Sequence, residues 1–438
     1  MKQAAGKLDY SPSQAVDLQG NAIAILFFLL VSGVLLFRLL MTSPLMNMVV
    51  PYTSEGGAFY AKFHLGTYLI IALLSVSLFT RRISLRGDDI ALFRFLILHA
   101  GLLAGLMIYV IAISRIGATG ILVDTYLAAC LVAILMMTLP HHGRRLLGTL
   151  FVIVLTASAL LAIGEAVVQR RLMPFTESEP YFRATGLTGH PLSLGAYCVL
   201  AIGFALLTRW PIWVRLVTVA LIFFGCVASG ARTALVLASL EIVLLLFLVR
   251  WPKLSERDER KAKRLAFLVA AVMGGVLFAG LLAGGFLSRF QGASTDGNFM
   301  ARIDIYRIFG FVSWKDIMLG MSPQMLLETV REKLRLPYIE SAPVLIVLQA
   351  GLPAAIVLTV IVIRLILRLL HGAAMPAKIA TAVFLIGELS NNALATKNGD
   401  VILLFVLIMA FRARPGEIAA PRQGLLSMVS SRPLRVRV

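Results

Sequence analysis

The sequence predicts an all-α protein: a polytopic bundle of about 12 transmembrane helices with one large, partly helical loop. Two observations lead to this fold class. Apolar residues make up 59% of the 438 positions and charged residues only 14%, whereas a soluble domain is about half apolar and a quarter charged. The apolar residues fall in runs of about 20, long enough to cross a hydrocarbon core roughly 30 Å thick. A transmembrane β-barrel is excluded, because its strands alternate polar and apolar residues over about ten positions.

Twelve apolar runs define the predicted helices. In the first half of the chain they cover residues 21–41, 63–80, 90–114, 119–139, 146–168 and 191–207. In the second half they cover 212–229, 231–249, 265–287, 342–370, 379–395 and 401–411. The tenth run is longer than one crossing needs and the twelfth is shorter, so the number of crossings is predicted to within about one.

Lysine and arginine in the flanking loops predict the orientation, because cytoplasmic loops of membrane proteins carry an excess of them. With the N-terminus inside, cytoplasmic segments hold 25 of the 41 and the opposite side holds 14, with Arg38 and Arg94 inside helices. Both termini are then cytoplasmic. The chain divides into a cytoplasmic segment 1–20, a bundle 21–412 and a basic, disordered cytoplasmic tail 413–438.

The net charge of +19 follows from this charge asymmetry and from attraction to anionic lipid headgroups, so nucleic-acid binding is not expected. The first apolar run lacks a cleavage site and is expected to remain as an anchor. Cys130, Cys198 and Cys226 fall inside predicted helices and serve as small apolar fillers. No disulfide framework or metal-binding motif is present, and no metal or cofactor is expected.

The longest loop, 288–341, faces outward in this orientation and is expected to fold as a cap rather than stay disordered. Ser322 and Pro323 form a helix start, with a capping residue followed by proline in the first turn. Apolar residues then recur at helical spacing, opposite charged ones, as in an amphipathic helix on the membrane or the bundle. The apolar residues are Leu326, Leu327, Val330 and Leu334.

Two candidate sites flank the predicted sixth and eighth helices. In the segment 183–197, RATGLTGHPLSLGAY, glycines including Gly189 surround His190 and allow close approach of a ligand to the backbone. The alternative is a simple turn before a helix-starting proline. In SGARTAL, 229–235, Arg232 stands at the outer membrane boundary, where a diphosphate headgroup would lie. The alternative is an arginine that extends to the interface.

Two further candidate sites lie in and just after the cap. Arg302 and Arg307 are suited to phosphate oxygens, although either can instead pair with Asp304 or Asp296. Glu340, just before the tenth helix, can act as a general base or stabilise the helix N-terminus. Substrate-binding residues are expected among the polar side chains nearby. They are Arg183, Gly189, Arg307, Tyr306 and Tyr338.

The segments GLTGHPLSLGAY and SGARTAL resemble the core of the O-antigen ligase and O-antigen polymerase superfamily of bacterial membrane enzymes. Later segments are similar in the same order: ARIDIYRIFGF, DIMLGMSP and ESAPVLIVLQAGLPA. The resemblance covers 183–354 and implies a bundle of about a dozen helices in the bacterial inner membrane with one large periplasmic loop. Many members have His-Asn where this chain has Glu340–Ser341. That departure favours a polymerase or exopolysaccharide branch over a ligase and makes Glu340 the candidate for the missing group.

The resemblance implies metal-independent glycosyl transfer outside the cytoplasm, from an oligosaccharide on undecaprenyl diphosphate to an acceptor hydroxyl. Arg232 and Arg302 would neutralise the leaving diphosphate, and Glu340 or His190 would take the acceptor proton. Membrane lipids, a flippase and chain-length or export proteins are the expected partners.

Two other functions remain open. A transporter or flippase of lipid-linked saccharide would need a polar path through the bundle, for which Glu165 and Glu241 are candidate gating groups. A non-catalytic component of a polysaccharide export complex is the third.

Overall fold

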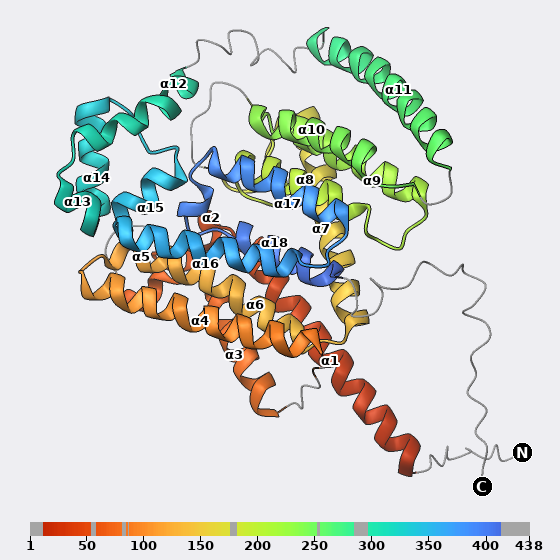
Figure 1. Ribbon diagram of the computed structural model, residues 1–438, viewed down its shortest axis with the longest axis horizontal. Helices are drawn as coiled ribbons and strands as arrows, with labels where there is room; N and C mark the ends of the chain where they lie inside the picture. Colours follow the sequence, from red (N-terminus) through yellow and green to blue (C-terminus); the bar gives the residue numbers. More distant parts are fainter. Residues whose placement is uncertain are drawn as a thin grey trace, which may run out of the picture.

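The computed structural model describes residues 12–53, 58–80, 85, 87–175, 182–251, 255–283 and 297–412. Within these ranges the chain is helical and contains no β-strand. Figure 1 shows long helices stacked side by side, with a group of short helices beside them at one end. The predicted tail 413–438 and the first 11 residues lie outside the described ranges.

The apolar runs of the sequence correspond to helices. In the first half these are α1 (Pro12–Leu40), α3 (Leu65–Thr80), α4 (Asp88–Ala112), α5 (Ile116–Ile121), α6 (Ala128–Met137), α7 (His141–Val168) and α8 (Pro191–Ala205). In the second half they are α9 (Ile212–Ala228), α10 (Arg232–Leu248), α11 (Glu256–Ala283), α15 (Ala342–Ala350), α16 (Leu352–Leu370), α17 (Met375–Leu389) and α18 (Asp400–Phe411). A short helix, α2 (Ser43–Val49), follows α1.

Several of these helices are long and apolar enough to cross a membrane, which indicates a membrane-embedded protein. Five meet that description among the described residues: Ala22–Leu40, Asp88–Ala112, Ile116–Met137, His141–Val168 and Leu352–Leu370. Four shorter apolar helices, α3, α8, α9 and α18, stand beside them. The twelve crossings stay a prediction.

Helix α18 forms the centre of the bundle. All of its 12 residues are buried, and it packs against α6, α7 and α8. At 1.5 Å per residue it is about 18 Å long, well short of a hydrocarbon core. A helix that is apolar on every side and this short must be enclosed by other helices.

The predicted helix 342–370 is two helices, α15 and α16, separated at Gly351. Gly351 has φ 85°, and a Cβ there would lie 2.5 Å from the carbonyl oxygen of Met318. At Gly320, with φ 74°, a Cβ would lie 2.7 Å from the carbonyl oxygen of Gln349. Only glycine fits these positions, so the two glycines join the cap to the break between α15 and α16.

The cap consists of short helices: α12 (Gly297–Asp304), the 3₁₀ turn η5 (Ile305–Gly310), α13 (Trp314–Leu319), α14 (Pro323–Thr329) and the π turn η6 (Val330–Leu334). The hydroxyl of Ser322 accepts a hydrogen bond from the amide of Met325, as the sequence predicts for a capping residue. Leu326 and Val330 are buried. Residues 288–296 of the predicted loop lie outside the described ranges.

Helix α11 begins earlier than the predicted run 265–287, because the charged residues 256–264 are also helical. The amide of Asp258 donates to the hydroxyl of Ser255, which caps the first turn. Glu259 and Lys263 form an ion pair at 2.7 Å one turn apart, and Lys263 donates to the carbonyl of Phe247. These contacts hold the start of α11 against the end of α10.

Candidate functional site

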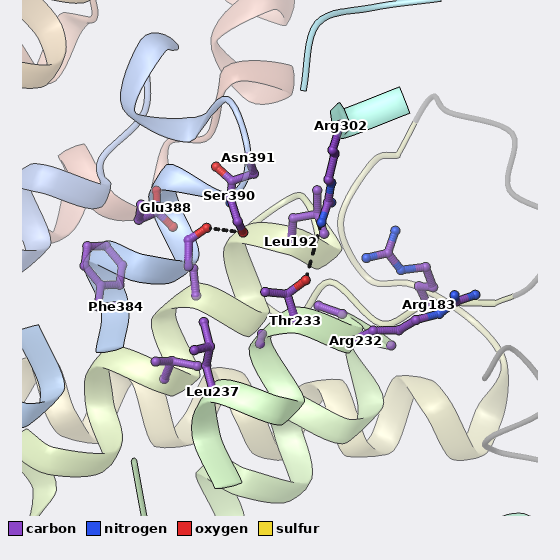
Figure 2. A pocket seen from close by; sticks show the side chains of 16 residues that line it. Arg183, Leu192, Arg232, Thr233, Leu237, Arg302, Phe384, Glu388, Ser390 and Asn391 are labelled. Atoms are coloured by element: carbon purple, nitrogen blue, oxygen red, sulfur yellow. Dashed lines mark hydrogen bonds between the residues drawn. The ribbon is translucent and has the colours of Figure 1, made fainter. Parts of the chain in front are cut away.

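Three arginines from separate segments line one cavity of about 210 Å³. Arg183 comes from the loop before α8, Arg232 from the first turn of α10 and Arg302 from α12. Figure 2 shows the three arginines on one side of the cavity and Glu388 and Asn391 on the other. Apolar side chains of α8, α10 and α17 complete the wall. They are Leu192, Ala196, Val199, Leu237 and Phe384.

The loop that carries Arg183 is held by a buried carboxylate on α7. Glu165 accepts hydrogen bonds from the amides of Leu172, Thr185 and Gly186 at 2.8 to 2.9 Å. Gly186 has φ 53°, and a Cβ there would collide with Ser158. Glu165, a candidate gating group in the sequence, therefore fixes the glycine-containing loop.

Arg183 and Arg232 are brought together by the break between α9 and α10. The Nε of Arg183 donates to the carbonyl of Ser229 at 3.0 Å. Gly230, with φ 60°, lies against the stem of Arg183, where a Cβ would be 3.4 Å away. The polar segment SGAR, residues 229–232, thus connects α9 to α10 and places the guanidinium groups of Arg183 and Arg232 at one cavity.

Arg302 pairs with Glu340 and not with Asp304, while Asp296 lies outside the described residues. Its Nε donates to a carboxylate oxygen of Glu340 at 2.8 Å, and another nitrogen donates to the hydroxyl of Thr233 at 3.4 Å (Figure 2 shows the bond to Thr233). The Glu340 side chain is only 15% exposed. Glu340 therefore aligns Arg302 with the start of α10 in this structure.

A second, larger cavity of about 1020 Å³ contains Gly189 and His190 in its wall. The Nδ1 of His190 accepts a hydrogen bond from the amide of Leu192 at 3.1 Å and caps α8, with Pro191 in the first turn. An imidazole that accepts at Nδ1 carries its proton on Nε2. Gly189 has φ 71°, and a Cβ there would lie 2.8 Å from the Thr42 hydroxyl.

A network around Asp124 builds one side of this second cavity. Asp124 lies in a π turn, η2 (Leu122–Leu127), and its carboxylate accepts from the Tyr52 hydroxyl at 2.9 Å and the Thr67 hydroxyl at 2.7 Å. The amide of His64 also donates to it. Burial, and then the nearby Arg38 guanidinium, lowers the pKa of His64 from 6.5 to about 3.

Lys397 closes the same wall. Its ammonium donates to the carbonyls of Tyr52 and Lys62 at 2.8 and 3.0 Å and lies 4.6 Å from the Tyr52 ring centre. Burial lowers the pKa of Lys397 from its ordinary value, against the opposing effect of Asp124.

The two cavities meet at three residues that line both: Leu192, Glu388 and Asn391. Glu388, in the last turn of α17, and Asp400, the first residue of α18, are both buried, and their carboxyl groups interact electrostatically. Tyr197 and Asn391 complete this cluster, Tyr197 against Asp400 and Asn391 against Glu388. Two buried carboxyl groups that interact in this way repel each other when both are charged.

The remaining predicted substrate-binding residues line neither cavity. The Ser341 hydroxyl donates to the hydroxyl of Tyr306 at 3.3 Å, and Tyr306 is about half exposed. Arg307 forms an ion pair with Asp304 at 3.5 Å, and its side chain is 75% exposed. Tyr338 is also exposed.

The sequence interpretation missed most of the segment between α17 and α18. Asn391, Asn392, Lys397 and Asp400 line the second cavity. A signal was present, because residues 390–400 are a polar run between two apolar ones. The predicted helix 379–395 obscured it: the described helix ends at Leu389.

Comparison with known proteins finds no match: no family model, no curated protein and no solved structure is similar to this chain. The class of protein is therefore defined by the features of the chain itself. It is an all-helical protein with long apolar helices, and it gathers three arginines beside a cavity that meets a larger polar one.

Proposed function

We propose that this protein transfers glycosyl groups at the periplasmic face of the bacterial inner membrane, with undecaprenyl-diphosphate-linked oligosaccharide as donor. The observation that carries the proposal is the cavity lined by Arg183, Arg232 and Arg302. Guanidinium groups bind phosphate oxygens in pairs and stay charged at all physiological pH values. Three of them next to an apolar wall suit a diphosphate joined to a lipid tail.

The sequence resemblance supports the same chemistry. In the proposed reaction an acceptor hydroxyl attacks the anomeric carbon, a new glycosidic bond forms, and the bond to the diphosphate breaks. The arginines stabilise the negative charge that develops on the leaving diphosphate, which is commonly the largest contribution to such catalysis. Polymerisation is favoured over ligation, because Glu340–Ser341 replaces the His-Asn pair of many ligases.

Glu340 and His190, the two side chains predicted to take the acceptor proton, differ in their ability to do so. Glu340 forms an ion pair with Arg302, which stabilises its charged form, so it becomes a stronger base if a diphosphate replaces it on that guanidinium. His190 accepts at Nδ1 and carries its proton on Nε2, so it suits a hydrogen-bond donor better than a base. Both roles stay predictions.

The test uses purified protein and lipid-linked oligosaccharides extracted from source cells that lack this gene. The expected result is a ladder of longer chains with release of undecaprenyl diphosphate. Arg232→Ala and Arg302→Ala are expected to lower the rate by about 100-fold or more, since each removes a charge that stabilises the leaving group. Arg331→Ala, an exposed cap position, is the control and is expected to leave the rate unchanged. Wild-type rates in both site variants would contradict the proposal.

A transporter of lipid-linked saccharide is the second candidate. Glu241, Glu388 and Asp400 are buried carboxyl groups inside or at the ends of helices, which is typical of proton-coupled carriers. In protein-containing vesicles, a transporter would move the extracted lipid-linked oligosaccharides across the bilayer without lengthening them. Longer chains in the same vesicles exclude transport as the sole activity.

A further inference from the structure

The second cavity has about five times the volume of the arginine-lined one, and the proposed donor chemistry leaves it unused. At about 1020 Å³ it is large enough for an extended ligand. We propose that this cavity binds the acceptor saccharide, an inference that rests on the proposed function. Glu388, where the two cavities meet, accepts the proton of the attacking hydroxyl.

The lining of the second cavity suits a neutral, hydroxyl-rich ligand. Amide side chains supply donors and acceptors together, as sugar hydroxyls require. The buried Oε1 of Gln349 has no hydrogen-bond partner within the described part of the chain, and a buried acceptor without a donor is costly. Aromatic rings provide flat apolar surfaces beside these amides. The residues are Gln349, Asn391, Asn392, Phe59 and Phe175.

The cations of this cavity are directed at the protein backbone, which argues against a phosphate ligand. Lys397 donates to two backbone carbonyls. Arg38 donates to the carbonyls of Asp124 and Asn398 at 3.1 and 2.9 Å. Lys62 donates to the carbonyl of Pro51 at 2.9 Å. The diphosphate is therefore expected to bind beside Arg183, Arg232 and Arg302, and the uncharged saccharide is expected to bind in the second cavity.

The place where the two cavities meet determines where the reaction occurs. A donor sugar attached to a diphosphate in the first cavity and an acceptor in the second can react only at that junction. Of the three residues that line both cavities, Leu192, Glu388 and Asn391, only Glu388 has an ionisable side chain. Both oxygens of its carboxyl group are buried and have no hydrogen-bond partner within the described part of the chain, so an acceptor hydroxyl can supply the missing partner.

The step balances as a single displacement. The acceptor oxygen forms a bond to the anomeric carbon while the bond from that carbon to the diphosphate oxygen breaks. The electron pair of the broken bond leaves with undecaprenyl diphosphate, whose charge the arginines stabilise. The proton of the acceptor hydroxyl passes to the carboxylate of Glu388, which becomes neutral until it releases that proton.

The test measures donor binding and chain extension separately in the purified full-length protein. Binding is measured with undecaprenyl diphosphate, and extension with the extracted lipid-linked oligosaccharides. Free oligosaccharide, released from the same extract by mild acid, is added as the acceptor at varied concentration. Glu388→Gln is expected to bind undecaprenyl diphosphate within about twofold of wild type but to extend chains at least about 100-fold more slowly. Glu332→Gln, exposed on the cap, is the matched control and is expected to match wild type in both.

Gln349→Leu tests the saccharide site independently of Glu388. Loss of one hydrogen bond is expected to raise the acceptor concentration at half-maximal rate about fivefold, with undecaprenyl diphosphate binding unchanged. If Glu388→Gln does not fold, an unchanged acceptor dependence in Gln349→Leu overturns the inference.

Other outcomes are equally decisive. Extension by Glu388→Gln within about threefold of wild type overturns the role of Glu388. Loss of extension in Glu340→Gln together with full activity in Glu388→Gln assigns the proton to Glu340 and leaves the proposed function intact. Wild-type protein that neither binds undecaprenyl diphosphate nor extends chains overturns the proposed function itself, and this inference with it.

Discussion

At the scale of single residues, Glu165 is the side chain on which the arginine site depends most directly. It accepts three backbone hydrogen bonds from the loop that carries Arg183. Glu165→Ala leaves the buried amides of Thr185 and Gly186, and the part-buried amide of Leu172, without an acceptor, at a cost of about 1 to 3 kcal/mol for each buried group. We expect a loss of about 3 kcal/mol or more in the free energy of unfolding, measured by thermal unfolding in detergent. Glu256→Ala, an exposed position, should lose less than about 0.5 kcal/mol; equal losses would contradict this role.

His64 predicts a pH dependence of stability. Its pKa is about 3 in the folded protein and about 6.5 in the unfolded chain. Between these values the unfolded chain binds the extra proton, so stability is full above pH 6.5 and falls as the pH drops towards 3. At pH 5 the loss from this group is about 2 kcal/mol. Unfolding measured at pH 7.5 and pH 5 should show a smaller loss in His64→Gln than in wild type; identical losses would exclude His64 as the source.

Part of the site could be predicted from sequence because isolated charges next to apolar runs are conspicuous. Arg183, Arg232 and Arg302 were found in this way, and they line one cavity. Their partners were not predictable, since the contact of Arg302 with Glu340 joins residues 38 positions apart. Local spacing indicates only the pair of Arg307 with Asp304, three residues away.

At the scale of secondary-structure elements, every apolar run of the sequence corresponds to a helix, but breaks inside the runs were harder to predict. The run 342–370 is uninterrupted by charge until Arg364, so composition alone predicts one helix. The break at Gly351 combines a local signal, this glycine and a proline in the first turn of α16, with a tertiary contact, the close approach of Met318 in the cap. The end of α17 at Leu389 likewise depends on polar residues that face a cavity rather than on a helix-breaking proline or glycine.

This break predicts a difference between two glycines. Gly351→Ala forces an alanine to adopt a φ of 85° and places its Cβ against the Met318 carbonyl. We expect a loss of about 2 kcal/mol or more in the free energy of unfolding, because both backbone strain and collision oppose the change. Gly310→Ala is the matched control within the cap, since a Cβ there meets nothing within 4 Å. Thermal unfolding of both variants checks the prediction, and equal stability would show that the cap does not approach Gly351 as described.

At the scale of the whole molecule, the enclosed helix α18 explains why the number of crossings is difficult to predict. An apolar run of 10 to 14 residues fits a buried helix or a partial crossing as well as a full one. Here the 12 residues of α18 are all buried, and Asp400 at its start lines the second cavity. A helix that begins at a polar cavity and continues through the core places one end of that cavity inside the bundle, while exposed residues such as Met48 and Phe59 line its outer part.

The orientation of the whole molecule decides which compartment supplies the substrates. Positive charges predict that the cap faces outward and the start of α11 faces the cytoplasm. The three native cysteines are buried, so cysteines introduced at exposed positions can be labelled selectively in the otherwise natural protein. Lys333→Cys on the cap and Arg257→Cys on α11 are exposed positions that suit this purpose. With a membrane-impermeant thiol reagent, Lys333→Cys should react in intact spheroplasts and Arg257→Cys only after permeabilisation. The reverse pattern would place the arginine cavity on the cytoplasmic side, where the proposed transfer to exported saccharide cannot occur.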